Sequence, residues 1–151
     1  MSTVQTNPRP VIFVACLAIL ILGLNAFALE SHTTRRFRDL AEIRSALAAY
    51  HRDHGAYPAS TGATIGDGSN RPASRWLPDL APEYIKSVPR DPRMLAQPNM
   101  QYLYLSDGKD YKLISHAPED FGLASRLRPE LIDPTRPTYA YGYWSEGASA
   151  W

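Results

Sequence analysis

His51 and His54 lie three residues apart with Asp53 between them, a spacing that raises the question of a metal site. Two imidazoles at this spacing on one helix could share a zinc ion. A zinc site needs further ligands, and no third ligand follows at a recognisable spacing. The competing interpretation is a pair of solvated histidines near a helix C-terminus, where cations are favoured. The sequence therefore predicts no metal-binding residue.

Acyl-transfer chemistry would need a nucleophile, a base and an acid. Ser115, His116 and Glu119 contain these residue types, but they cluster only along the chain, near the end of an expected strand. The segment 142–147 (Gly-Tyr-Trp-Ser-Glu-Gly) is one residue too long for the Gly-x-Ser-x-Gly elbow. The glycine-rich stretch 59–75 lacks the Gly-Lys-Ser/Thr of a phosphate-binding loop and is interpreted as a surface loop. We expect no catalytic residue, no cofactor-binding residue and no enzyme.

Four aromatic residues near the C-terminus could stack on a ligand: Tyr139, Tyr141, Tyr143 and Trp144. The same alternation is typical of a strand that packs its aromatic side chains into a core, and we favour that interpretation. A ligand-stacking face stays open as an alternative.

The element that must position these residues is the stretch 11–54, which contains no proline and predicts a single helix of about 66 Å. Residues 11–29 carry no charge, and twelve of the nineteen are Leu, Ile, Val or Phe. Their transfer into a bilayer is favourable by about 4–7 kcal/mol. This length and composition predict a transmembrane segment at 11–29, preceded by a short tail at 1–10.

A cleaved signal peptide is the competing interpretation of this segment, because Ala26-Phe27-Ala28 fits the small-x-small cleavage pattern. Both interpretations place the C-terminal domain outside the cytoplasm. The three arginines that follow the segment, Arg35, Arg36 and Arg38, favour the opposite topology by the positive-inside rule. We interpret them as a solvated helix face beside lipid headgroups.

Residues 30–55 form the second half of the helix and carry an apolar stripe: Phe37, Leu40, Ile43, Leu47 and Tyr50. The steps of three and four residues predict an amphipathic stem that needs a partner. Gly55 and Pro58 predict its end. Residues 56–151 must supply the partner as a globular α+β head.

Strands are expected at 101–106 and 110–115, joined by an Asp-Gly turn, and a third is expected at 139–144. The hairpin is the expected partner of the stem stripe. A short helix or turn is expected at 80–88, and a short helix at 123–131. The fold class is thus α+β, with a long N-terminal helix packed on a small antiparallel sheet.

Charge is balanced in the exported part, because Arg9 is the only charged residue before Glu30 and the rest carries fifteen basic and fifteen acidic residues. A nucleic-acid-binding protein usually presents a basic face, so we expect no nucleic-acid partner. The single cysteine, Cys16, excludes an intramolecular disulfide.

The order of several motifs resembles the pseudopilins of bacterial type II secretion, especially the major subunit, and type IV pilin-like proteins more broadly. A long helix ends in Gly-Ala-Tyr-Pro at 55–58, and the segment 80–92 reads Leu-Ala-Pro-Glu-Tyr-Ile-Lys-Ser-Val-Pro-Arg-Asp-Pro. A tyrosine-rich hairpin with Asp-Gly-Lys-Asp-Tyr at 107–111 follows. The sequence departs from the family at its start, since the glycine-led prepilin peptidase motif is missing and no acidic residue precedes Glu30.

The resemblance implies a pilin-like fold and a structural role. It implies a single-pass protein of the bacterial inner membrane with its head in the periplasm. Its partners would be membrane lipid and other pilin-like subunits, reached through the N-terminal helix. Major pseudopilins also bind calcium through oxygen ligands late in the head, where this chain has Glu119, Asp120 and Asp133 in loops. We expect these acids to be solvated or to act as caps, with calcium as the open alternative. The alternative function is an exported periplasmic binding module with an aromatic C-terminal ligand face.

Overall fold

The computed structural model describes the backbone of residues 9–60, 77–95 and 102–151, and side chains from residue 32 onward within these ranges, except at 78, 94 and 95. Helix α1 runs unbroken over Arg9–His54, which confirms the single helix predicted for 11–54. The N–H of Gly55 (φ 72°) donates to the carbonyl of His51 at 2.8 Å. This left-handed cap ends the helix where the sequence predicted.

The sheet has three antiparallel strands in the order β1-β2-β3: Tyr102–Ser106, Tyr111–His116 and Ala140–Trp144. Asp107 shapes the β1–β2 turn, because its Oδ1 accepts the N–H groups of Lys109 and Asp110 at 2.9 and 2.7 Å. Gly108 adopts a φ of 89° in the same turn, a conformation that glycine takes without strain. The hairpin and the third strand are confirmed.

Short helical turns connect these elements. Helix α2 spans Phe121–Leu127 and a separate 3₁₀ turn spans Pro129–Leu131, so a single helix over 123–131 was wrong. Pro129 disfavours helical geometry in the residue before it, and Arg128 takes φ −138° and ψ 67°. Further 3₁₀ turns occupy Pro78–Leu80, Pro92–Leu95 and Glu146–Ala148. Residues 81–87 form turns rather than a helix.

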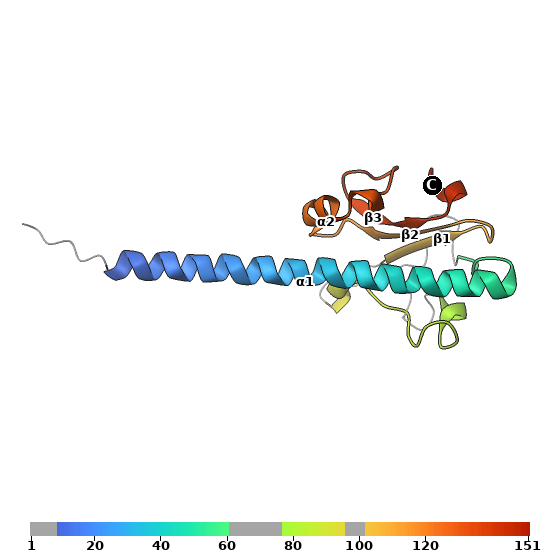
Figure 1. Cartoon of the computed structure of the whole chain (residues 1–151), viewed down its shortest axis with the longest axis horizontal. Coiled ribbons are helices and arrows are strands. Elements are labelled where there is room, and N and C mark those ends of the chain that lie inside the picture. The colour runs from blue at the N-terminus through green and yellow to red at the C-terminus, as the bar shows by residue number, and fades with distance from the viewer. Residues whose placement is uncertain (1–8, 61–76, 96–101) are drawn as a thin grey trace, which may run out of the picture.

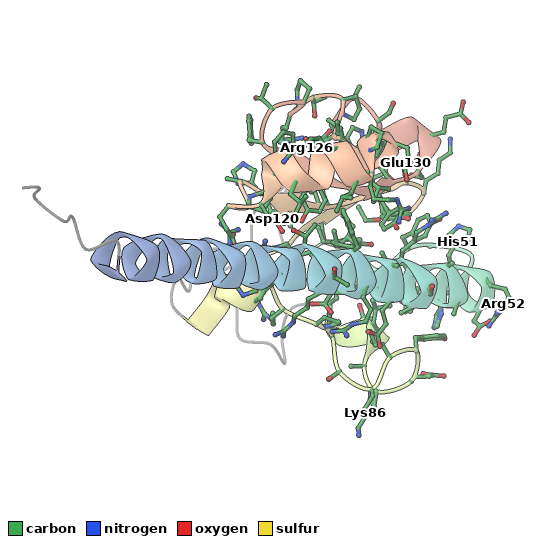
Figure 2. All side chains as sticks on the ribbon, turned by 60° about the vertical axis from the view of Figure 1, so that its left-hand side comes forward. His51, Arg52, Lys86, Asp120, Arg126 and Glu130 are labelled. Carbon is green, nitrogen blue, oxygen red and sulfur yellow. The ribbon has the colours of Figure 1, made fainter. Side chains whose placement is uncertain are left out.

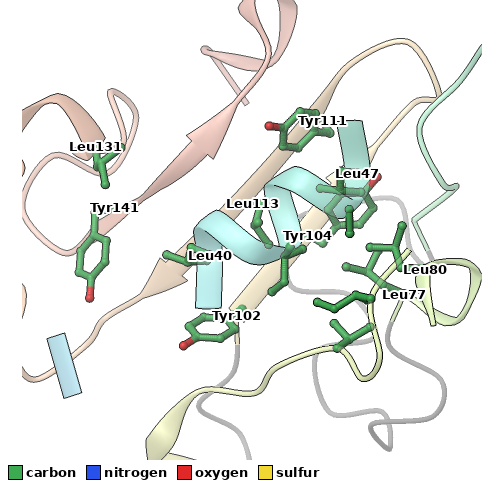
Figure 3. Packing of buried hydrophobic residues seen from close by; sticks show 14 of the residues in the cluster. Leu40, Leu47, Leu77, Leu80, Tyr102, Tyr104, Tyr111, Leu113, Leu131 and Tyr141 are labelled. Carbon is green, nitrogen blue, oxygen red and sulfur yellow. The ribbon is translucent and has the colours of Figure 1, made fainter. Parts of the chain in front are cut away.

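Figure 1 shows the sheet and α2 on one side of α1 and the segment around Pro78–Leu80 on the other. The predicted stripe of α1 is confirmed, since Leu40, Ile43 and Leu47 are fully buried. They belong to one apolar cluster with Tyr102, Tyr104, Leu113 and Leu80 (Figure 3). The hairpin is therefore the partner of the stem, as expected.

The other face of the sheet is covered too. Lys112 and Ile114 alternate with Tyr111 and Leu113 along β2, and all four are buried. The C-terminal turns lie over this second face, and the carbonyl of Trp151 accepts a bond from Lys112 Nζ at 2.8 Å.

Among the residues that the structure describes, no helix combines the length and apolarity needed to cross a bilayer. The side chains of the segment predicted to span the membrane, 11–29, lie outside the described residues, as does most of the predicted loop 59–75.

Candidate functional site

The charges of the head gather where it meets the stem. We call this group the ionic cluster: Arg36 of α1, Asp91 immediately before the 3₁₀ turn Pro92–Leu95, Arg93 within that turn, and Glu119 and Asp120 before α2. It forms because residues more than fifty positions apart converge on one guanidinium. Arg36 is fully buried, although it belongs to a helix face predicted to be solvated. That part of the prediction was wrong.

Arg36 binds three carboxylates at once. Its Nε and Nη2 donate to the two oxygens of Asp91 at 3.0 and 3.1 Å. Nη2 also donates to Glu119 Oε2 at 2.8 Å. Nη1 lies 2.7 Å from Asp120 Oδ2, so the two groups form an ion pair. The angles of this contact do not meet the geometry of a hydrogen bond. A guanidinium suits this role, because its planar fork can serve several oxygens.

The pKa shifts of Arg36, Asp91 and Glu119 favour the charged form of each group. Burial alone would lower the pKa of Arg36, but the hydrogen bond and charge of Asp91 outweigh burial and raise it. Burial would raise the pKa of Asp91, yet bonds from Arg36 and Arg93 hold it below the ordinary value. Glu119 behaves alike: burial acts to raise its pKa, and bonds from His32 and Arg36 lower it. These groups therefore stay ionised at neutral pH and serve to join elements.

Hydroxyl groups extend the junction. Thr33 Oγ1 donates to Asp120 Oδ2 at 2.6 Å, and Tyr141 OH donates to the other oxygen at 3.3 Å. On the next turn of the stem, Tyr102 OH donates to Asp39 Oδ2 at 3.0 Å. Burial and the charge of Asp39 raise the pKa of Tyr102, so its hydroxyl stays protonated. The stem is thus bonded to β1 and to the residue that precedes α2, and Tyr141 joins β3 to that same carboxylate.

A second buried cation lies on the far face of the sheet. Lys112 Nζ donates to Asp133 Oδ1 at 2.9 Å and to the carbonyls of Ser149 and Trp151 at 3.1 and 2.8 Å. Arg136 Nη1 reaches the other oxygen of Asp133 at 2.8 Å. Burial acts to raise the pKa of Asp133, but the bonds from Lys112 and Arg136 lower it. This group fastens the C-terminal turns to β2.

The three acids considered for calcium are divided between these two groups. Glu119 and Asp120 serve Arg36, whereas Asp133 serves Lys112 and Arg136. Within residues 32–60, 77–93 and 102–151, no three His, Cys, Asp or Glu side chains gather as a metal site would require. Calcium binding stays a prediction of the resemblance alone.

The two histidines at the stem end stack on different tyrosines. The ring of His51 lies 4.4 Å from that of Tyr57, and the ring of His54 lies 4.0 Å from that of Tyr50. His54 Nδ1 is also 3.4 Å from Tyr84 OH. Each imidazole therefore has its own aromatic partner, and the structure does not bring the pair together around a shared ion.

Ser115 and His116 fall on opposite faces of β2, as neighbours in a strand must. Ser115 is fully buried, and His116 packs edge-on against Tyr139 with centroids 5.3 Å apart. Burial and the charges of Arg136 and Arg93 lower the pKa of His116. Glu119 belongs to the ionic cluster. The three residues do not form a nucleophile–base–acid relay.

Most of the C-terminal aromatic residues are engaged in packing. Tyr141 is buried and meets Phe37 edge-on at 5.5 Å. Arg44 lies 4.7 Å from the ring of Tyr143, and Lys112 lies 5.6 Å from the ring of Trp144. Tyr139 is the member with a substantially exposed ring. The ligand face of the alternative function thus has little free aromatic surface.

Sequence reasoning missed the two buried cations, although Arg36 carried a usable signal. It lies four residues before Leu40 and therefore on the same stripe as Ile43 and Leu47. Its partner Asp91 lies 55 residues away, and no local pattern links them. Lys112 carried a weaker signal, because lysine is seldom fully buried and nothing near it in the chain marks it as an exception.

Comparison of the chain with protein-family models, with curated proteins and with solved structures finds no match. The class of protein must therefore be inferred from the fold and the charged junction. The fold and the charged junction together define a small α+β head joined to one long helix.

Proposed function

We propose that the protein is a pilin-like structural subunit, anchored in the bacterial inner membrane with its head in the periplasm, that serves type II secretion or a related envelope filament. The observation that supports this most is the projection of α1 beyond the head (Figure 1). The stretch from Arg9 to residue 31 amounts to about 34 Å of helix. Its sequence at 11–29 is uncharged and apolar.

The junction supports the same role. A structural subunit must pass force between its helix and its head without the two separating. Here a buried apolar stripe is reinforced by an arginine that binds three carboxylates from two other segments. In the described residues, buried charge is used for holding elements together.

The test is to express the full chain in a bacterium and locate it. We expect it in the membrane fraction after carbonate extraction, with the head cut by protease only when the outer membrane has been opened. N-terminal sequencing should give an intact start; a start at Leu29 would show a cleaved signal peptide and contradict the proposal.

Assembly can be tested with Cys16, the only cysteine of the chain, which lies within the apolar segment. If subunits bundle through this segment, oxidation should yield a disulfide-linked dimer in membranes. The Cys16→Ser variant is the control and should give none. A head found in the soluble fraction would refute the anchor. A membrane-bound chain that yields only monomer would refute bundling through the segment around Cys16.

A further inference from the structure

The end of the head nearest the projecting helix lies close to the predicted membrane surface. Thr33 bonds to Asp120 at the start of α2, and it follows residue 29 by four positions. Four residues of helix amount to about 6 Å. The polar headgroup layer is roughly 5–8 Å thick on each side of the hydrocarbon core. On the proposed anchor, the start of α2 would therefore be level with this layer. Figure 1 shows α2 at the end of the head nearest the projecting part of α1.

Four exposed guanidinium groups lie at this end of the head, two on α1 about 9–14 Å beyond residue 29 and two at the end of α2. We call them the basic collar: Arg35 and Arg38 of α1, Arg126 of α2, and Arg128 immediately after it. Arg38 and Arg128 lie on different sides of the stem. Arg128 is 5.7 Å from the ring of Phe37, and Arg38 follows Phe37 by one residue, about 100° further around the helix. Arg38 keeps 71% of its side chain exposed.

Acidic groups only partly offset the collar. Asp39 is shared by Arg35 and Arg38, and Glu130 pairs with Arg128. These two acids face four guanidinium groups, and the exposed Glu42 follows Arg38 by four residues on α1. Behind them, the ionic cluster has three carboxylates and two guanidinium groups, and its most exposed member is Glu119, which also contacts His32 at 2.9 Å. Counted with Glu42, the collar has four guanidinium groups and three carboxylates, a surplus of one positive charge.

We propose that the basic collar binds the phosphate groups of anionic phospholipids and seats the head against the membrane. The inference rests on the proposed anchor. A guanidinium group can donate two parallel hydrogen bonds to one phosphate group. An anionic membrane surface also attracts arginines that lie within about a Debye length of it, 8–10 Å. Leu127, 54% exposed between Arg126 and Arg128, adds apolar surface beside the cations.

The experiment uses the full Cys16→Ser chain in lipid nanodiscs that hold one chain each, so that a second copy cannot occupy the collar. A bimane fluorophore on Leu127→Cys reports quenching by nitroxide-labelled headgroups. Discs of phosphatidylcholine alone are compared with discs that also contain phosphatidylglycerol. A fluorophore on Lys86→Cys is the positional control, because Lys86 lies on the far side of α1 from α2 (Figure 2).

We expect stronger quenching at position 127 when phosphatidylglycerol is present, weakened by added salt, and no such change at position 86. Arg38→Gln should shift the ratio of seated to unseated heads about fivefold toward unseated. Arg52→Gln is the matched control, since Arg52 is equally exposed on α1 and also pairs with the following aspartate, but at the distal end. It should change nothing.

The proposal would be overturned if quenching at position 127 did not depend on phosphatidylglycerol. It would also be overturned if Arg38→Gln and Arg52→Gln reduced that quenching equally. A failure of the anchor itself is separable, because the chain would then not enter the discs at all. Near-ultraviolet circular dichroism of each variant checks that the tyrosine-rich core is retained.

Discussion

Replacing Arg36 by methionine should be among the most damaging single changes to the head. Methionine has about the right length and no charge, so it would leave the buried Asp91 and Asp120 without their shared cation. Breaking one side of a buried ion pair typically costs about 3–5 kcal/mol. Arg93 still reaches Asp91, with Nε 3.2 Å away, so we expect the lower part of that range, about 3–4 kcal/mol.

The assay is urea or thermal unfolding of the full chain in detergent, followed by the near-ultraviolet signal of its aromatic core. A loss of about 3–4 kcal/mol corresponds to roughly 10–20 °C in Tm for a domain of this size. Arg38→Met is the matched control on the same helix. Its exposed guanidinium lies 3.6 Å from Asp39, and surface pairs of this kind contribute less than about 1 kcal/mol.

The pH dependence gives the sharper test. In the native protein Asp91 has a lowered pKa, so its contribution to stability is present above the unfolded value and is lost as pH falls through the folded value. Without Arg36, burial would favour the neutral carboxyl. The stability difference between the two proteins should therefore narrow as pH falls from 7 toward 4. An Arg36→Met variant that loses under 1 kcal/mol, or a difference that does not respond to pH, would refute this account of the junction.

Three further changes test other parts of the head, the first two in the same unfolding assay and the third by proteolysis. Tyr102→Phe removes a buried hydroxyl that donates to a carboxylate of α1 and should cost about 1–3 kcal/mol; no loss would show that water replaces the bond. Gly142→Ala should be strongly destabilising, because the new Cβ would lie 2.1 Å from a backbone carbonyl of β2, whereas Gly122→Ala meets nothing within 4 Å and should be neutral or slightly stabilising. Lys112→Met should free the C-terminal turns, seen as faster protease cleavage there, because Asp133 loses its buried ammonium; an unchanged cleavage rate would contradict that role.

Much of the fold could be predicted from sequence because local patterns carried it. The three-and-four spacing of Leu40, Ile43 and Leu47 predicted the buried face of α1, and Asp107-Gly108 predicted the hairpin turn. Both signals act between near neighbours in the chain. The end of α2 differs from the predicted one because Pro129 disfavours helical geometry at Arg128, and this local effect overrides the helix propensity of the segment.

The junction could not be predicted in the same way. Arg36 was interpreted together with Arg35 and Arg38, because three arginines in four residues look like a solvated surface. Helical geometry separates them, turning one inward and two outward. The inward arginine is tolerated only because Asp91 and Asp120 arrive from distant segments, and that convergence is a property of the tertiary structure.

The 46-residue length of α1 has a mechanical consequence. Because α1 is unbroken and packs against the head along its second half, a shift of the helix along its axis would displace the head by the same distance. With about 1.5 Å of rise and 100° of turn per residue, sliding two such helices past each other by one helical turn would lift one head about 5 Å relative to its neighbour. A small axial displacement of the Arg9 end of α1 would therefore produce an equal displacement of the head.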